Sequence, residues 1–166
     1  MTEDKKPEDS VTKLRELIKD IKIAMLTTVE ADGSLRSRPM GTQQAEFDGD
    51  LWFFTGKSSG KVTEIQHNQQ VNLSFAEPGD NRYVSVSGRA ELIDDRSKEK
   101  ELWNPFIKAW FPKGLDDPDL TLLKIKVEAA EYWDAPSSTM VNLVGFAKAL
   151  LTGKRPDVGE NEKLSL

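Results

Sequence analysis

The feature that most restricts the fold of this chain is a run of short β-rich segments joined by Asp-Gly turns. IAMLTTVE at 23–30 and LRSRPMGTQQAEF at 35–47 flank the turn Ala-Asp-Gly-Ser at 31–34. A second turn at 48–50, Asp-Gly-Asp, leads into LWFFT at 51–55. Asp-Gly between extended segments is typical of hairpins, because glycine accepts the positive φ angles that tight turns require. This part of the chain is therefore expected to be an antiparallel meander.

Three further segments continue the β pattern. They span residues 71–77, 82–93 and 120–135. In the second, Val84 and Val86 alternate with other residues, which predicts one buried face. The opposite face carries Tyr83, Ser85 and Ser87. Gly88 suggests a bulge or bend of the kind that barrels need at corners. The sequence thus predicts a mainly β fold with added helices: six antiparallel strands in a small barrel.

Four segments have helical periodicity. They span residues 9–22, 59–68, 95–111 and 139–152. Asp9 or Ser10 is the expected cap of the first, and Pro105 is expected to break the third. Ser137 or Ser138 would cap the last helix, and Gly153 would end it. The expected inward positions are Leu14, Leu17, Ile18 and Ile21 in the first helix and Val62 and Ile65 in the second. In the last helix Met140, Val144, Ala147 and Leu151 form one stripe. One domain is expected over 9–153, after a disordered lead at 1–8 and before a polar tail at 154–166.

Composition excludes several classes of function. The 166 residues carry a net charge of -5 and include no cysteine. An acidic chain is a poor partner for nucleic acid, and without thiols it can form neither disulfides nor zinc-thiolate sites. The charged start is not expected to be a signal peptide, and no apolar run approaches the roughly 18 residues of a membrane span. A soluble, cytoplasmic protein is expected. His67, the only histidine, lies in a polar stretch and is expected to be exposed at a helix end.

The segment FFTGKSSGKVTEI at 53–65 has the order strand, Gly/Ser/Lys loop, helix. A Walker A loop has four residues between its glycines and a Ser or Thr after the lysine. Here three residues separate Gly56 from Gly60, and Val62 follows Lys61, so an NTPase is not expected. The loop still suits an anion. Its N–H groups, the hydroxyls of Ser58 and Ser59, the helix N-terminus and Lys61 are all possible donors.

A second cationic segment lies upstream. In a strand, Arg36, Arg38 and Met40 would share one face, and Pro39 would place the strand at an edge or at a break in pairing. Two arginines on one face repel each other unless an anion lies between them, and arginine suits bidentate phosphate binding. Exposure of both arginines on a solvent face is the alternative.

Together these segments resemble a known family. R-P-M-G in one strand, an Asp-Gly turn, W-F-F-T and then S-x-K at a helix start are similar to the FMN-binding split barrels related to pyridoxamine 5′-phosphate oxidase. The resemblance is greatest to the general stress protein 26-like sub-family. In order and spacing it extends from about Leu14 to Asp134.

The resemblance implies a six-stranded antiparallel split barrel that forms a homodimer, with two FMN molecules at the subunit interface. Arg38 and Lys61 would bind the FMN phosphate, with Arg36 as a further ligand. Ser59 and Ser58 would add hydroxyl donors. The remaining expected cofactor contacts are Pro39, Met40, Gly41, Phe54 and Thr55, together with Trp133 or Trp110 from the partner. A core or interface position is the alternative for Trp133. Trp103, Phe106, Trp110 and Phe111 also suit packing.

The chain departs from the oxidase in two places. Gly60 stands where the oxidase has an arginine, and no histidine follows His67 to form its C-terminal Arg-x-His segment. Oxidation of pyridoxamine phosphate is therefore not expected. Two functions remain open: an FMN-dependent oxidoreductase with an unidentified small substrate, and a non-catalytic flavin sensor or FMN buffer linked to stress. Deazaflavin or haem is a further alternative for the cofactor.

Overall fold

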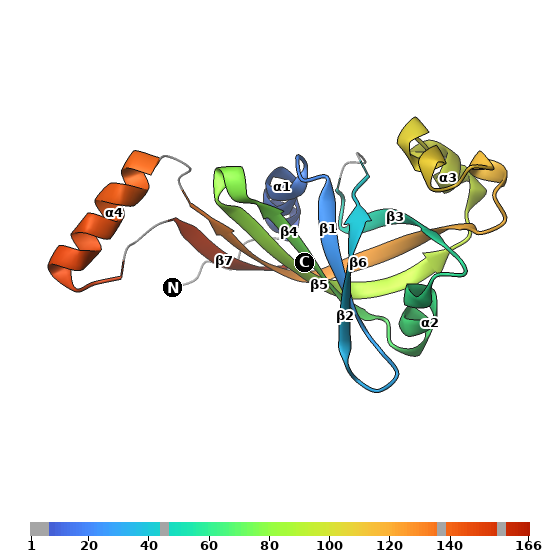
Figure 1. Ribbon diagram of the computed structural model, residues 1–166, viewed down its shortest axis with the longest axis horizontal. Helices are drawn as coiled ribbons and strands as arrows, with labels where there is room; N and C mark the ends of the chain where they lie inside the picture. The colour runs from blue at the N-terminus through green and yellow to red at the C-terminus, as the bar shows by residue number, and fades with distance from the viewer. Residues whose placement is uncertain (1–6, 44–46, 136–138, 156–158) are drawn as a thin grey trace.

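The computed structural model describes residues 7–43, 47–135, 139–155 and 159–166 (Figure 1). Its strands are β1 (Ile23–Val29), β2 (Leu35–Gly41), β3 (Asp50–Gly56), β4 (Gln70–Glu77), β5 (Arg82–Ile93), β6 (Leu120–Asp134) and β7 (Glu160–Ser165). The helices are α1 (Pro7–Ile18), α2 (Gly60–His67), α3 (Arg96–Leu102) and α4 (Thr139–Thr152). Three 3₁₀ turns are η1 (Pro78–Asp80), η2 (Pro105–Ala109) and η3 (Gly114–Asp116).

The strands form one antiparallel sheet that curls into a half-barrel. Its order is β2-β1-β4-β5-β6-β3, and β7 pairs with the remaining length of β6. The edge strands β2 and β3 approach each other without pairing in the described part of the chain, so the barrel stays split. Pro39 lies in β2, the edge strand, where its missing N–H removes no ladder bond to a further strand. This arrangement confirms the expected mainly β fold and antiparallel split barrel.

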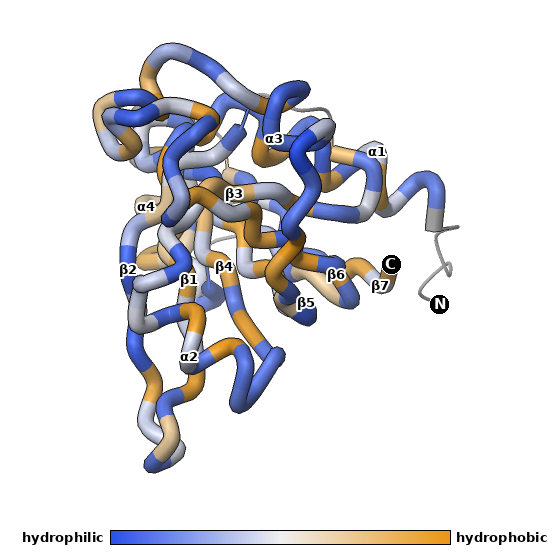
Figure 2. Tube along the Cα trace, turned by 90° about the vertical axis from the view of Figure 1, so that its right-hand side faces the viewer, coloured by the Kyte–Doolittle hydropathy of each residue, from blue (hydrophilic) through white to orange (hydrophobic). Residues whose placement is uncertain are grey.

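The core lies inside the curl of the sheet. Inward residues of every strand meet the apolar side of α1, whose Leu14, Leu17 and Ile18 are buried. Ile21, just beyond α1, is buried with them. In Figure 2 the strands alternate between hydrophobic and hydrophilic residues, while the turns at the periphery are mostly hydrophilic. The alternation in β5 is confirmed, because Val84 and Val86 are almost fully buried and Tyr83 is exposed.

Gly88 marks the irregularity that the sequence predicted. The register between β5 and β6 shifts between Ser87 and Gly88, which is a bulge in the longest strand pair. A Cβ at position 88 would overlap with the backbone carbonyl oxygen of Lys126 on β6. The bulge therefore needs glycine for the close approach of two backbones.

Both ends of the chain differ from the expectation. The first helix begins at Pro7, so Asp9 and Ser10 lie within it, and Ser10 is buried. Proline suits the first helical position, because its missing N–H would have no partner there. At the other end, residues 160–165 form β7 on β6 and are not a free polar tail.

A polar network explains why β7, although its sequence is polar, pairs with the sheet. The buried Tyr132 hydroxyl donates to Glu162 at 2.9 Å and lies 3.3 Å from Glu160. Lys13 of α1 forms an ion pair with Glu160 and lies over the Tyr132 ring. Leu164 of β7 is buried in the core. Burial and the two carboxylates raise the pKa of Tyr132, so its hydroxyl remains a donor.

The last helix is present, but its apolar stripe does not pack in the described chain. In Figure 1, α4 lies apart from the sheet, beyond the ends of β6 and β7. Val144 and Leu151 are 59% and 89% exposed, and Ala147 is exposed as well. Met140 lies outside the described side chains, and Ser137 and Ser138 lie outside the described residues. Gly153 ends the helix with a φ of 67°.

The third helical segment is shorter than expected. It ends at Leu102, and η2 begins at Pro105. Trp103 packs edge-to-face on Phe54, with ring centroids 5.8 Å apart, which confirms its packing role. Phe106 and Trp110 are 86% and 83% exposed, so they do not pack within the described chain. Among the described helices, none has the length and hydropathy that crossing a membrane requires.

We expect Gly88→Ala to lower the free energy of unfolding by about 2–4 kcal/mol. The added Cβ would overlap with backbone atoms of Lys126, which cannot move aside as the end of a flexible side chain can. The measurement is urea denaturation followed by tryptophan fluorescence. Gly41→Ala is the matched control, since nothing lies within 4 Å of a Cβ at that strand position. Equal stabilities of the two variants would contradict the backbone contact.

Candidate anion-binding site

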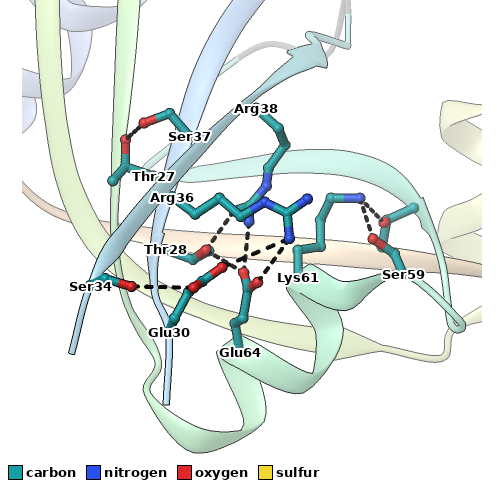
Figure 3. Close-up of polar contacts among 11 residues, drawn as sticks. Thr27, Thr28, Glu30, Ser34, Arg36, Ser37, Arg38, Ser59, Lys61 and Glu64 are labelled. Atoms are coloured by element: carbon teal, nitrogen blue, oxygen red, sulfur yellow. Dashed lines mark hydrogen bonds and ion pairs between the residues drawn. The ribbon is translucent and has the colours of Figure 1, made fainter. Parts of the chain in front are cut away.

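Helix α2 brings a lysine and a glutamate to the place where the two edge strands approach each other. The helix begins after Ser59, and Val62 and Ile65 are buried against the sheet. Their spacing of three residues fixes the rotation of the helix. Lys61 and Glu64, each one position before a buried residue, then face the side chains of β1, β2 and β3 (Figure 3). Val62 and Ile65 are the inward positions that the sequence predicted.

The loop before α2 is held by one carboxylate. Asp119 accepts hydrogen bonds from the Ser58 N–H at 2.8 Å and from the Ser58 hydroxyl at 3.0 Å. The Lys57 N–H donates to the Asp119 carbonyl, and the Ser59 N–H donates to the Gly56 carbonyl. These loop N–H groups are therefore not open to an anion, in contrast to the expectation. The N–H groups of Gly60 and Lys61, the first two of α2, have no acceptor within the helix.

A closed ring of hydrogen bonds fixes Arg38. Its Nη1 donates to Thr28 Oγ1 at 2.5 Å, and its Nη2 donates to Glu64 Oε2 at 2.7 Å. Thr28 Oγ1 in turn donates to Glu64 Oε2 at 2.5 Å. Thr28 is fully buried, and the side chains of Arg38 and Glu64 are only 16% and 11% exposed. Charge-assisted bonds in so dry a setting hold the guanidinium in one position.

Arg36 lies over the same carboxylate, closer to solvent. Its Nη1 is 3.7 Å from Glu64 Oε1 and 3.8 Å from Glu30 Oε1, and its side chain is 60% exposed. The same nitrogen is 3.9 Å from the position that a Cβ of residue 60 would take. Gly60 thus leaves space beside Arg36 at the start of α2. Arg36 and Arg38 do share a face, as predicted, and the anion between them is the Glu64 carboxylate.

Lys61 is the cation of this cluster whose direct partners are all hydroxyl groups. Its Nζ donates to Ser59 Oγ at 2.8 Å and to Thr55 Oγ1 at 2.9 Å. Within the described residues, no carboxylate forms an ion pair with it. Its pKa is lowered from 10.5 because burial disfavours the charge and Arg38 repels it, while Glu64 opposes the shift. A half-buried ammonium without a direct counter-ion is a place for an anion.

The other residues predicted to contact the cofactor lie on two different faces of their strands. Met40 is buried in the core on the same side of β2 as Arg38, whereas Pro39 and Gly41 are on the outer side. Thr55 is buried and bonded to Lys61, but Phe54 points to the opposite side of β3 and packs on Trp103. Thr55 and Phe54 therefore lie on opposite faces of β3.

Neither predicted tryptophan belongs to the polar cluster of its own chain. Trp133 is 43% exposed on β6, next to Tyr83 of β5 on the outer face of the sheet. Trp110 is 83% exposed after η2. An aromatic contact from either residue to a ligand at Lys61 of another subunit remains a prediction.

Sequence reasoning missed Glu64, Thr28 and Asp119. The sequence could have indicated Glu64, because it follows Lys61 by three residues on a helix and so lies on the same side of that helix. The indication for Thr28 was weaker: it is a polar residue at the next inward position of β1 after the buried Ala24 and Leu26. Nothing in the sequence indicated Asp119, because its contact with Ser58 joins residues that are 61 positions apart. His67 is exposed at the end of α2, as predicted.

One cavity in the described part of the chain lies elsewhere. It has a volume of about 440 Å³ and is lined by residues of α1, β3 and the segment after β2, among them Arg15, Thr42, Gln43 and Trp52. None of its lining residues belongs to the Arg36, Arg38, Lys61 and Glu64 cluster.

Comparisons with known proteins agree with this fold. The chain matches the family described as pyridoxamine 5′-phosphate oxidase like over residues 9–157. It is 30% identical over 154 residues to Protein bli-3 of Neurospora crassa, which covers 87% of this chain and 74% of that protein. A crystal structure of a Jannaschia protein described as a general stress protein 26 is 28% identical with a TM-score of 0.76 and covers 96% of this chain and 99% of its own.

A second solved structure is similar over the barrel. It is described as the general stress FMN/FAD binding protein of Xanthomonas citri, and it is 28% identical with a TM-score of 0.65. The match covers 76% of this chain and 89% of that one. The resemblance that the sequence motifs indicated is thereby confirmed.

We expect Thr28→Val to lower the free energy of unfolding by about 1–3 kcal/mol, because it leaves a largely buried guanidinium and a largely buried carboxylate each short of one partner. Thermal or urea unfolding measures the loss. Thr121→Val makes the same change at another buried threonine, whose bond to the Ile93 carbonyl is longer at 3.4 Å. A loss at position 28 no larger than that at 121 would speak against the ring.

Proposed function

Because the chain belongs to the pyridoxamine 5′-phosphate oxidase-like family, we propose that it is a flavin-binding protein whose ligand is FMN. The observation that carries this proposal is Lys61, a half-buried ammonium with hydroxyl partners and no ion pair in the described chain. The FMN phosphate would lie against Lys61, Ser59 and the first N–H groups of α2. Arg36 and Arg38 would add positive charge beside it.

The residues present offer a phosphate positive charge and hydrogen-bond donors. The cluster holds three cations (Arg36, Arg38 and Lys61) and two carboxylates, Glu64 and Glu30, which leaves one positive charge uncompensated. A phosphate monoester is a dianion near neutral pH. Helix N-termini, hydroxyl groups and ammonium groups together are a common way to bind it. Ser58 is a weaker candidate, since its hydroxyl is bonded to Asp119.

We propose a homodimer with two FMN molecules at the subunit interface. The outer face of the sheet supports this proposal, because Ile23, Met25, Tyr83 and Trp133 are 41–56% exposed there. Apolar side chains of this size on one face are a usual mark of an interface. Trp133 or Trp110 of the partner would then supply the aromatic contact to the flavin that the chain's own cluster lacks.

The activity we propose is that of a cytoplasmic oxidoreductase acting on a small molecule, in a stress-related role. The isoalloxazine, when bound, supplies the redox chemistry, so the protein needs few reacting groups of its own. What this chain supplies is phosphate binding by Lys61 and Ser59 and orientation by β2 and α2. A non-catalytic flavin carrier is the second candidate. It is favoured by the cluster itself, in which Arg36, Arg38 and Glu64 are engaged in holding one another.

We expect Lys61→Ala and Arg38→Ala each to weaken FMN binding about ten- to a hundredfold, since one charge-assisted phosphate contact is worth about 1.5–3 kcal/mol. Quenching of flavin fluorescence gives the affinities. Riboflavin has no phosphate, so its affinity should change little. Lys57→Ala is the matched control, because this lysine lies in the same loop but pairs with Asp94. Unchanged FMN affinity in both site variants would refute the phosphate site.

Turnover separates the two candidate functions. If the protein is an oxidoreductase, NADH or NADPH should bleach the bound flavin in the absence of oxygen, and an acceptor should restore its colour. A carrier would keep its flavin oxidised with every donor tried. The absorption spectrum of the purified protein tests the premise, since a haem spectrum, or a colourless protein that does not take up added flavin, would exclude both candidates.

A further inference from the structure

We propose that Glu64 is a positioning residue of the phosphate site: it fixes the guanidinium of Arg38 and supplies the counter-charge that holds three cations together before a ligand binds. This inference rests on the proposed function, since it assigns a role within the same site. It concerns a residue that sequence motifs did not single out, on the side of α2 that faces β1 and β2 (Figure 3).

Geometry gives Glu64 the central place in the cluster. One carboxylate oxygen accepts from both Arg38 and Thr28, and the other lies 3.7 Å from Arg36. The Thr28 hydroxyl closes the ring by accepting from Arg38. One edge of the Arg38 guanidinium is therefore fully used inside the protein. Its remaining N–H groups are held in a fixed direction, at no ordering cost when a ligand arrives.

Charge gives Glu64 a second role. Without it, the nearly buried Arg38 would have no described carboxylate partner, and an unpaired buried charge is costly. Burial raises the pKa of Glu64, but the hydrogen bonds from Thr28 and Arg38 and the charges of both arginines lower it overall. Glu64 is therefore ionised near neutral pH, where the flavin phosphate is mostly a dianion. Its negative charge also favours the protonated form of Lys61, which burial and Arg38 disfavour.

The charge of Glu64 has two opposite effects on FMN affinity at a single pH. The Glu64 carboxylate repels a bound phosphate, yet it keeps Arg38 in place and Lys61 protonated. Affinity at one pH is therefore not informative. The quantity to compare is the alkaline pH above which the protein no longer binds FMN more tightly than riboflavin. That loss of FMN preference follows deprotonation of Lys61, because an anion binds the ammonium and not the amine.

Few titratable groups face Lys61 from the elements around it. β2 contributes Arg36 and Arg38, and α2 contributes Glu64. Glu30 lies further out, paired with Arg36 after β1. β3 and the loop contribute only the hydroxyls of Thr55 and Ser59. Glu64 is thus the only carboxylate among the described groups that act directly on Lys61, so a change in the Lys61 titration when Glu64 is replaced reports on Glu64.

The experiment compares the wild type with Glu64→Gln, which removes the charge and keeps the shape, and Glu64→Asp, which keeps the charge. In the flavin-free protein, ¹³C NMR of the lysine side chains follows Lys61 from about pH 6 to about pH 11, with Lys61→Gln to assign its signal. In parallel, FMN and riboflavin affinities are measured over the same range. We expect Glu64→Gln to shift both the Lys61 titration and the loss of FMN preference to lower pH. Glu64→Asp should return both toward the wild type.

Glu128→Gln is the matched control, because Glu128 also pairs with an arginine, Arg89, and it has no contact with the cluster. Its Lys61 titration should coincide with that of the wild type. If Glu64→Gln is folded and its Lys61 titration also coincides with the wild type, Glu64 does not set the charge of the site and the inference is wrong. If the titration shifts but the wild type never prefers FMN over riboflavin, the coupling stands and the proposed phosphate site fails instead.

Discussion

Strand β6 is the element on which the rest of the structure depends. Its fifteen residues pair with β5 along one edge, and with β3 and then β7 along the other. It holds β3, the strand that carries Thr55 and leads into α2, and it also anchors β7 through Tyr132. The bulge at Gly88 bends this strand pair, which lets the sheet curl and brings its edges β2 and β3 toward each other.

The candidate site is a consequence of that curl. Arg36 and Arg38 come from one edge strand, and Thr55, Ser59 and Lys61 come from the other edge and the helix after it. Three cations cannot gather at one place without compensation. The chain provides Glu64 for the two arginines and hydroxyl groups for Lys61. One positive charge remains, and in the proposed function the flavin phosphate would bind against it.

Much of the fold could be predicted because it depends on local rules. Alternation of apolar residues, Asp-Gly turns and helical spacing located the six strands of the main sheet path and the four helices of the described residues. β7 escaped prediction because its sequence, ENEKLS, is almost entirely polar. Its strand state comes from pairing with β6 and from acceptors for the Tyr132 hydroxyl. The apolar face of α4 was predicted as well, yet nothing in the described chain covers it. The residue pattern of a helix shows which face can be buried, but it does not show where the partner of that face lies.

For the site, the sequence by itself determined the residue types and their order: two arginines alternating in a strand with an edge proline, and a Gly/Ser/Lys loop that opens a helix. Those features depend on the chemistry of neighbours along the chain. Only the tertiary structure decided that Glu64 lies between the arginines, that Ser58 is bonded to Asp119, and that Lys61 is left with hydroxyl partners. The reason is physical. Each of these pairings depends on how far the sheet curls and on how the buried residues of α2 set its rotation, and neither quantity is local to any motif.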